Sequence, residues 1–171
     1  MSDVKSPKAD GIVGSANNEF PAFECTGVAL HHHEVLLKMA ESALDRKESA
    51  LAIILAHAAC EIFTERTFKL VFSFKKVECL YNYVIDPVWE YNNLKAKKAR
   101  DLYMVMTGDN ITKDTKFWKG FLNHVDRRNR IAHKGETATR LEAEESCRIV
   151  KEFIRHVDQI LQEIQPPDWG E

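Results

Sequence analysis

The most informative stretch of the chain is 50-ALAIILAHAACEIFTERTFKLVF-72, which is apolar over much of its helical circumference. A helix with this pattern is buried on most of its sides, so we expect it to be the central element of the hydrophobic core. Asp45 followed by Glu48 has the spacing of a capping box, with Asp in place of the usual Ser or Thr. We therefore predict that this helix begins near Asp45.

Helical spacing continues on both sides of this stretch. Residues 32–44 form a short amphipathic segment whose apolar residues lie near one face: Val35, Leu36, Met39 and Leu44. Residues 73–86 fit either a helix or an extended connection. Asp86 and Pro87 are typical of an N-cap and a first helical position, which predicts a helix over residues 87–106. Its apolar positions are Val88, Tyr91, Leu94, Leu102, Tyr103 and Met106.

Two further helices have clear ends. One begins at residues 114–115 and ends at Gly135. Its apolar stripe is Trp118, Phe121, Leu122 and Val125. The last helix begins with a capping box of Thr139 and Glu142 and ends before a Pro-Pro pair. Because no alternating segment is long enough to support a sheet, the predicted fold class is all-α, an antiparallel bundle of four to five helices.

The composition limits the kind of protein this is. A chain of 171 residues can form one domain with a substantial core, and residues 1–28, rich in Gly, Ser and Asn, predict a flexible leader before a helical domain over residues 29–171. No segment resembles a membrane span or a signal peptide. The cysteines are far apart, which argues against a structural zinc site or a dense disulfide framework. We expect a cytoplasmic protein without membrane partner, metal or cofactor.

The charge is unevenly distributed along the chain. The net charge is −2, but residues 95–134 contain eleven Lys or Arg and four Asp, while the remainder is strongly acidic. A basic segment in an acidic protein suits a polyanionic partner, because a local positive field steers phosphate. The other interpretation is that these side chains are the solvated faces of two helices.

The segment 127-RRNRIAHKG-135 carries the candidate chemistry. It continues the apolar stripe of its helix and so runs beside the core. Asn129 and His133 are four positions apart and share a face, while Arg128 is one step round the helix. A guanidinium that forks onto phosphate, an amide that can orient it and an imidazole that titrates near neutrality therefore lie within about two turns.

Each of these side chains also has a purely structural interpretation. His133 could cap the end of its helix, where a cation is favourable. Arg128 could pair with Glu61 or Asp126, and Asn129 could be a buried amide with satisfied hydrogen bonds. The sequence alone leaves both interpretations open.

Other polar residues favour structural roles. In the stretch 31-HHHE-34 adjacent residues point apart on a helix, so at most two could share a metal ion, and a helix start is favoured. For His57 and Glu61, four positions apart, a buried pair is favoured, with Glu61 kept as a partner of Arg128. His124 is expected at the surface. The chain contains no Gly-rich phosphate loop, H-E-x-x-H motif or nucleophile elbow, so the enzyme classes that use them lack support.

The pattern Arg128-Asn129-x-x-x-His133 resembles the signature of the HEPN family, in which Arg and a polar residue are followed by His. Its place in the next-to-last helix, the capped amphipathic helix that follows, and Glu61 in the long second helix also resemble that family. The resemblance covers roughly residues 30 to 165.

This resemblance implies a metal-independent endoribonuclease that uses the RNA 2′-hydroxyl as nucleophile. The products would be a 2′,3′-cyclic phosphate and a 5′-hydroxyl. Arg128 would neutralise the scissile phosphate, His133 would act as the acid-base group, and Asn129 would hold the geometry. The resemblance adds three substrate-binding side chains: Arg127, Arg130 and Lys134.

The resemblance also implies a homodimer. One histidine per chain is a poor match to a reaction that needs both a base and an acid, and HEPN domains dimerise so that two motifs face each other across one cleft. The expected enzyme acts on RNA, is of the toxin or antiviral-defence kind and is held inactive by an antitoxin. The alternative is a non-catalytic HEPN dimer that binds nucleic acid or a nucleotidyltransferase-like partner.

Overall fold

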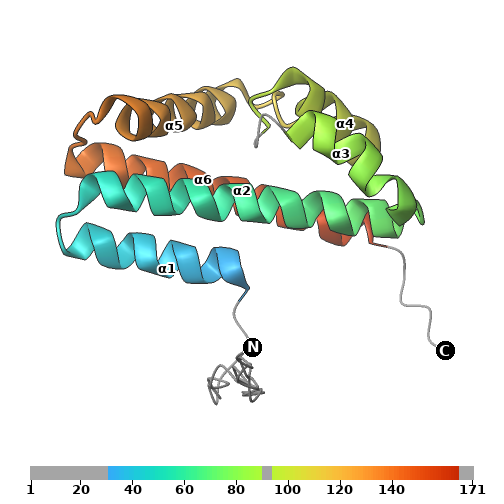
Figure 1. The fold of residues 1–171 in the computed structure, drawn as a ribbon, viewed down its shortest axis with the longest axis horizontal. Coiled ribbons are helices and arrows are strands. Elements are labelled where there is room, and N and C mark those ends of the chain that lie inside the picture. The colour runs from blue at the N-terminus through green and yellow to red at the C-terminus, as the bar shows by residue number, and fades with distance from the viewer. Residues whose placement is uncertain (1–30, 90–93, 166–171) are drawn as a thin grey trace, which may run out of the picture.

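The computed structural model describes residues 31–89 and 94–165, apart from the side chains of residues 86–89. These residues form α-helices and one short 3-10 helix, with no strand among them (Figure 1). The helices are α1 (His32–Asp45), α2 (Ser49–Phe74), η1 (Glu78–Leu80), α3 (Tyr81–Trp89), α4 (Lys97–Thr107), α5 (Thr115–Lys134) and α6 (Arg140–Ile164). The predicted all-α class and helical bundle are confirmed, with six α-helices in the described residues rather than four to five. The predicted leader over residues 1–28 lies outside the described residues.

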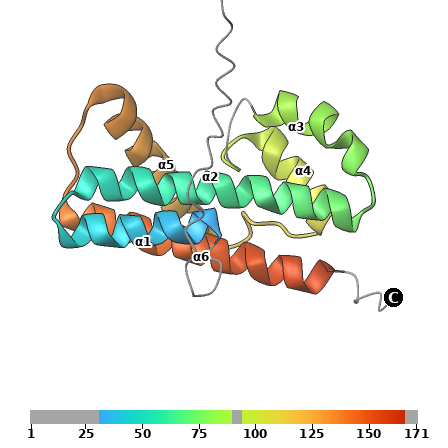
Figure 2. The same ribbon diagram turned by 60° about the horizontal axis from the view of Figure 1, so that its bottom comes forward.

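The long helix α2 lies at the centre of the molecule. α1 and α6 run alongside it, α5 crosses its N-terminal part, and α3 and α4 lie over its C-terminal half (Figures 1 and 2). Its buried residues therefore lie on most of its sides, and among the largest are Ile53, His57, Phe63, Phe68 and Val71. This arrangement confirms the prediction of a central buried helix.

The predicted start of this helix at Asp45 is wrong. Asp45 is the last residue of α1, and α2 begins at Ser49 with Glu48 as its N-cap. Between them Lys47 has a φ of 63°, the left-handed conformation that turns the chain back on itself. α1 stays helical to its end because Leu44 still packs on the core there.

The buried face of α1 also differs from the predicted stripe. His33, Ala40 and Ala43 are buried, whereas Val35 and Met39 are 40% and 49% exposed. Two alanines on the inner face allow α1 to lie close against α2, because they add little side-chain bulk between the two backbones. Leu37 and Leu44 also pack against the core, while Val35 and Met39 are left on the outer face.

The connection between α2 and α4 is largely helical. Residues 73–86 contain the end of α2, then η1 and the first part of α3. Three residues of α3 pack on the core at helical spacing: Tyr81, Val84 and Ile85. α3 therefore begins before the Asp86-Pro87 pair, so the predicted helix start at Pro87 is wrong, and α4 begins later, at Lys97.

α4 keeps part of the predicted stripe. Leu94, just before the helix, and Tyr103 within it are buried, and Leu102 and Met106 pack against the core. The predicted core positions Val88 and Tyr91 lie outside the described side chains.

The ends of α5 and α6 confirm the predictions. The Asp114 carboxylate accepts hydrogen bonds from the backbone N–H groups of Lys116 and Phe117, and Gly135 ends α5 with a φ of 66°. Thr139 and Glu142 form a capping box at the start of α6. Five residues therefore connect the two helices, which keeps them antiparallel neighbours (Figure 1).

No helix in residues 31–89 and 94–165 combines the length and apolarity needed to span a membrane. The three cysteines in these ranges are free thiols: Cys60 and Cys147 are buried, and Cys79 is exposed. Burial raises the pKa of the Cys60 and Cys147 thiols.

Candidate functional site at the contact between α2 and α5

The contact between α2 and α5 brings Arg128 to Glu61. Nη2 of Arg128 lies 4.0 Å from Oε2 of Glu61, and Nη1 donates a hydrogen bond of 3.1 Å to Oδ1 of Asn129. The Arg128 side chain keeps 28% of its surface exposed. Its guanidinium is therefore held on two sides while part of it stays open to an anion from solvent.

Behind this arginine lie two buried histidines, His57 of α2 and His124 of α5, which we call the histidine pair. They are 1% and 0% exposed, and Nδ1 of His57 lies 3.1 Å from Nε2 of His124. Nε2 of His57 also lies 3.2 Å from Oε1 of Glu61, although off the line of a hydrogen bond. Arg128, Glu61 and the histidine pair thus form one continuous polar contact between the two helices.

The environment of the histidine pair favours a neutral imidazole at His124. Burial lowers the pKa of His124 far below its ordinary value, and His57, Arg127 and Arg128 act in the same direction. The contact between Nδ1 of His57 and Nε2 of His124 requires that one of these nitrogens donates the hydrogen bond and the other accepts it.

The expectation that His124 lies at the surface is wrong. His124 follows the buried Phe121 by three positions and immediately precedes the buried Val125, so it lies on the inner face of α5. His57 and Glu61 are four positions apart on α2, and His124 and Arg128 are four positions apart on α5. The sequence signal for this cluster is therefore a pair of polar residues with helical spacing on each of two neighbouring helices.

His133 lies apart from these residues. It is exposed in the last turn of α5, and within the described residues no hydrogen bond or ion pair joins it to another side chain. Five positions correspond to about 140° round a helix, so Arg128, which faces α2, and His133 do not converge within one chain. Asn129 lies between them and is half-buried.

The three predicted substrate-binding residues differ in their environment. Arg127 is 12% exposed and donates hydrogen bonds to the Glu142 carbonyl, the Ser146 hydroxyl and the Glu145 carboxylate, at 3.1, 2.8 and 2.9 Å. This guanidinium joins α5 to α6. Arg130 pairs with Glu136 at 2.8 Å on the surface. Lys134 is exposed and makes no ion pair with a described residue.

The three N-terminal histidines do not converge on one point, although the rings of His31 and His33 stack with their centroids 5.7 Å apart. His33 is buried with its ring 4.8 Å from that of Phe63, while His32 is exposed. This confirms that the 31-HHHE-34 stretch begins a helix, with His31 as the N-cap.

Comparison with known proteins gives no match for this chain among protein-family models, curated proteins or solved structures. Membership of the HEPN family, and the roles that the resemblance assigns to individual residues, therefore stay predictions.

Proposed function

We propose that this protein is a metal-independent endoribonuclease of the HEPN type, active in the cytoplasm as a homodimer. The observation that carries the proposal is the environment of the Arg128 side chain. Its guanidinium is fixed by Glu61 and Asn129 and keeps a free edge. A preorganised cation of this kind stabilises the charge that builds up on a phosphate in the transition state.

The proposed reaction is an internal transfer at phosphorus. The 2′-oxygen of RNA forms a bond to phosphorus while the bond from phosphorus to the 5′-oxygen breaks. One imidazole takes the proton of the 2′-hydroxyl, and a second imidazole gives a proton to the departing 5′-oxygen. Arg128 neutralises the non-bridging oxygens, and His133 supplies the imidazoles, one from each copy.

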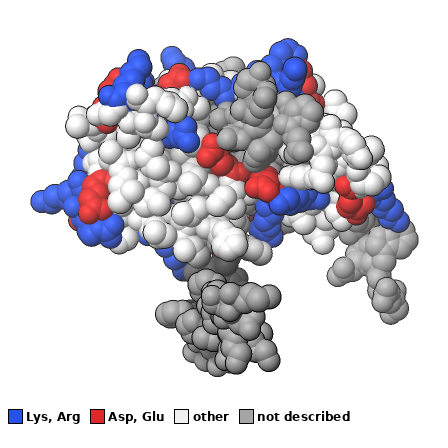
Figure 3. Space-filling model, viewed as in Figure 1, with Lys and Arg blue, Asp and Glu red and all other residues white. Residues whose placement is uncertain are grey.

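Two features support a homodimer. Arg128 and His133 diverge within one chain, so a complete site requires a second copy. The surface over α1 and the first half of α2 is largely free of charged side chains (Figure 3). These two helices expose large apolar side chains, among them Val35, Met39, Leu51 and Ile62, which would be suited to burial against a second copy.

Cleavage of a labelled RNA in EDTA tests the proposal. The wild type should cut the RNA, and Arg128→Ala and His133→Ala should each lower the rate by about 100-fold or more. Arg140→Ala and His32→Ala, at exposed positions away from the site, are matched controls that should keep the wild-type rate. Equal residual cleavage in all variants would indicate a contaminating nuclease and contradict the proposal.

One observation favours the second candidate function, a non-catalytic HEPN dimer. The Glu61 carboxylate already lies beside Arg128 and competes with phosphate for it. In that case the protein would bind RNA, an antitoxin or a nucleotidyltransferase-like partner without cutting RNA. RNA binding that persists without cleavage in the wild type would support this second function.

A further inference from the structure

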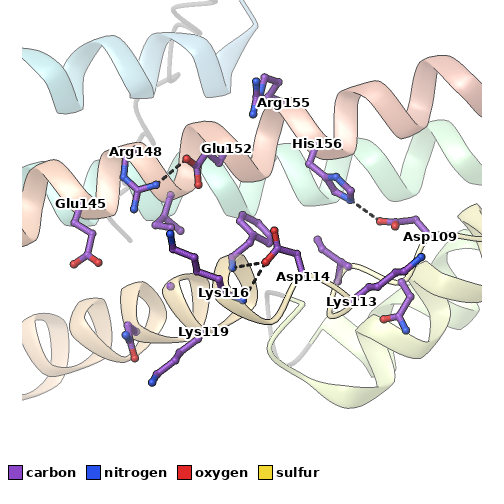
Figure 4. Close-up of a pocket in the computed structure, with 16 residues that line it drawn as sticks. Asp109, Lys113, Asp114, Lys116, Lys119, Glu145, Arg148, Glu152, Arg155 and His156 are labelled. Carbon is purple, nitrogen blue, oxygen red and sulfur yellow. Dashed lines mark hydrogen bonds and ion pairs between the residues drawn. The ribbon is translucent and has the colours of Figure 1, made fainter.

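A cavity lies away from the candidate site, in a groove between α5 and α6. Its volume is about 800 Å³, within the range of ligand sites. The loop from Asp109 to Asp114 closes one end, and α5 and α6 form the two walls (Figure 4). Ile111 and Ile149 contribute apolar surface to its floor.

The acidic side chains of this groove are all engaged. Asp109 accepts hydrogen bonds from the buried Tyr103 hydroxyl at 2.9 Å and pairs with His156 at 2.8 Å. Glu152 pairs with Arg148 at 2.7 Å. Of the two remaining acids, Asp114 caps the N-terminus of α5, and Glu145 pairs with Arg127.

Three lysines of the groove have no such partner. Lys113, Lys116 and Lys119 are exposed and make no ion pair with any residue in the described ranges. Figure 4 shows Lys116 pointing across the groove towards α6 and Lys113 at one end, whereas Lys119 points from α5 away from α6. The groove is lined by five Lys or Arg and four Asp or Glu, a formal excess of one positive charge. The three lysines that lack an ion-pair partner are spread along the groove rather than gathered at one point.

Two rings lie beside these cations. The Phe117 ring is 6.3 Å from that of His156, at an interplanar angle of 39°. His156 is held in place by Asp109, and Phe117 is partly exposed. A positive groove with adjacent rings is the arrangement that binds single-stranded nucleic acid, because phosphates follow the cations and bases stack on the rings.

We propose that the groove between α5 and α6 binds a single strand of RNA through its phosphates and one stacked base. This inference rests on the proposed function, since it adds a second contact for the same RNA. The spread of the lysines favours a strand over a free nucleotide, whose phosphates would need donors that converge. Lys116 and Arg128 are separated by about 18 Å along α5, so a strand of several nucleotides could contact both sites.

Binding of a fluorescein-labelled 2′-O-methyl RNA, measured by fluorescence anisotropy, tests the groove. This probe lacks the 2′-hydroxyl nucleophile, so the result does not depend on cleavage. The triple variant Lys113→Gln, Lys116→Gln, Lys119→Gln should bind about tenfold or more weakly, and the slope of log affinity against log salt should fall by about two. Phe117→Leu, which keeps apolar packing, should weaken binding about fivefold or more.

The matched control is the triple variant Lys38→Gln, Lys47→Gln, Lys75→Gln, which changes the net charge equally at exposed positions elsewhere. It should bind within about twofold of the wild type. Equal weakening of binding in both triple variants would contradict RNA binding in the groove. Competition by a free mononucleotide as strong as by the unlabelled strand would contradict it as well. Neither result would affect the cleavage test of Arg128. A wild type that does not bind the strand would overturn the groove and count against RNA as the partner.

Discussion

Glu61 uses both oxygens of one carboxylate, with Oε1 facing His57 and Oε2 facing Arg128. A single residue of α2 thus contacts both the buried His57 and Arg128, the side chain proposed to bind phosphate. A network of polar side chains like this one stabilises the fold only while each member keeps its partner. The stability of the fold should therefore depend on pH through the histidine of this network that is buried on α5.

We predict that acid destabilises the protein through His124. Burial and the nearby His57, Arg127 and Arg128 lower its pKa in the folded state, whereas the unfolded imidazole takes up a proton near pH 6.5. Below that pH the unfolded chain binds more protons, so the free energy of unfolding should fall by up to about 1.4 kcal/mol per pH unit. Urea unfolding at several pH values between 7 and 5 measures this slope.

The variant His124→Gln keeps a hydrogen-bonding group without a titrating imidazole. Its free energy of unfolding should fall less steeply with acid than that of the wild type, while the exposed-site control His32→Gln should follow the wild type. A slope that is unchanged in His124→Gln would show that His124 does not cause the acid sensitivity.

At the scale of secondary-structure elements, Arg127 of α5 donates three hydrogen bonds to residues of α6. Replacing it with Gln should lower the free energy of unfolding by about 2 to 3 kcal/mol, because buried acceptors on α6 lose a charged donor. Arg130→Gln removes a half-exposed surface pair and should cost less than about 1 kcal/mol. Denaturant unfolding of both variants checks the difference. Equal losses would contradict a special role for Arg127.

The elements were predictable where the signal was local. Asp114, Gly135 and the Thr139 capping box fix helix ends through bonds within one turn, and the sequence predicts them correctly. The pairs at Asp45 and Asp86 have equally good local patterns but do not begin helices. There, packing of distant residues on the core determines where each helix starts, and no local pattern contains that information.

The candidate site was predictable only in part. The motif led to Arg128, Asn129 and Glu61, which lie in contact. The buried position of His124 and the structural role of Arg127 depend on which face of α5 meets α2 and which meets α6. That rotation follows from the packing of whole helices, so spacing along one helix could not reveal it.

At the scale of the whole molecule, the proposed reaction uses His133 from both copies, so a single His133→Ala chain should inactivate a dimer. An equimolar mixture of wild type and His133→Ala that exchanges subunits should keep about a quarter of the activity of the same amount of wild-type protein, because a quarter of the dimers carry two His133 side chains. Without exchange the mixture should keep about half. RNA cleavage before and after mixing measures the difference. Activity that stays near half despite proven exchange would contradict a site shared by two copies.

The exposed thiol of Cys79 offers a way to see such an assembly directly. Cys60 and Cys147 are shielded and hold their protons firmly, so a maleimide added to the folded protein should attach at Cys79 once Cys25, outside the described residues, is replaced by Ser. Cys79 lies beyond the end of α2, on the connection to α3, far along the chain from the motif. A nitroxide carried there would report the spacing between two protomers by pulsed electron paramagnetic resonance, without changing the residues proposed to contact RNA.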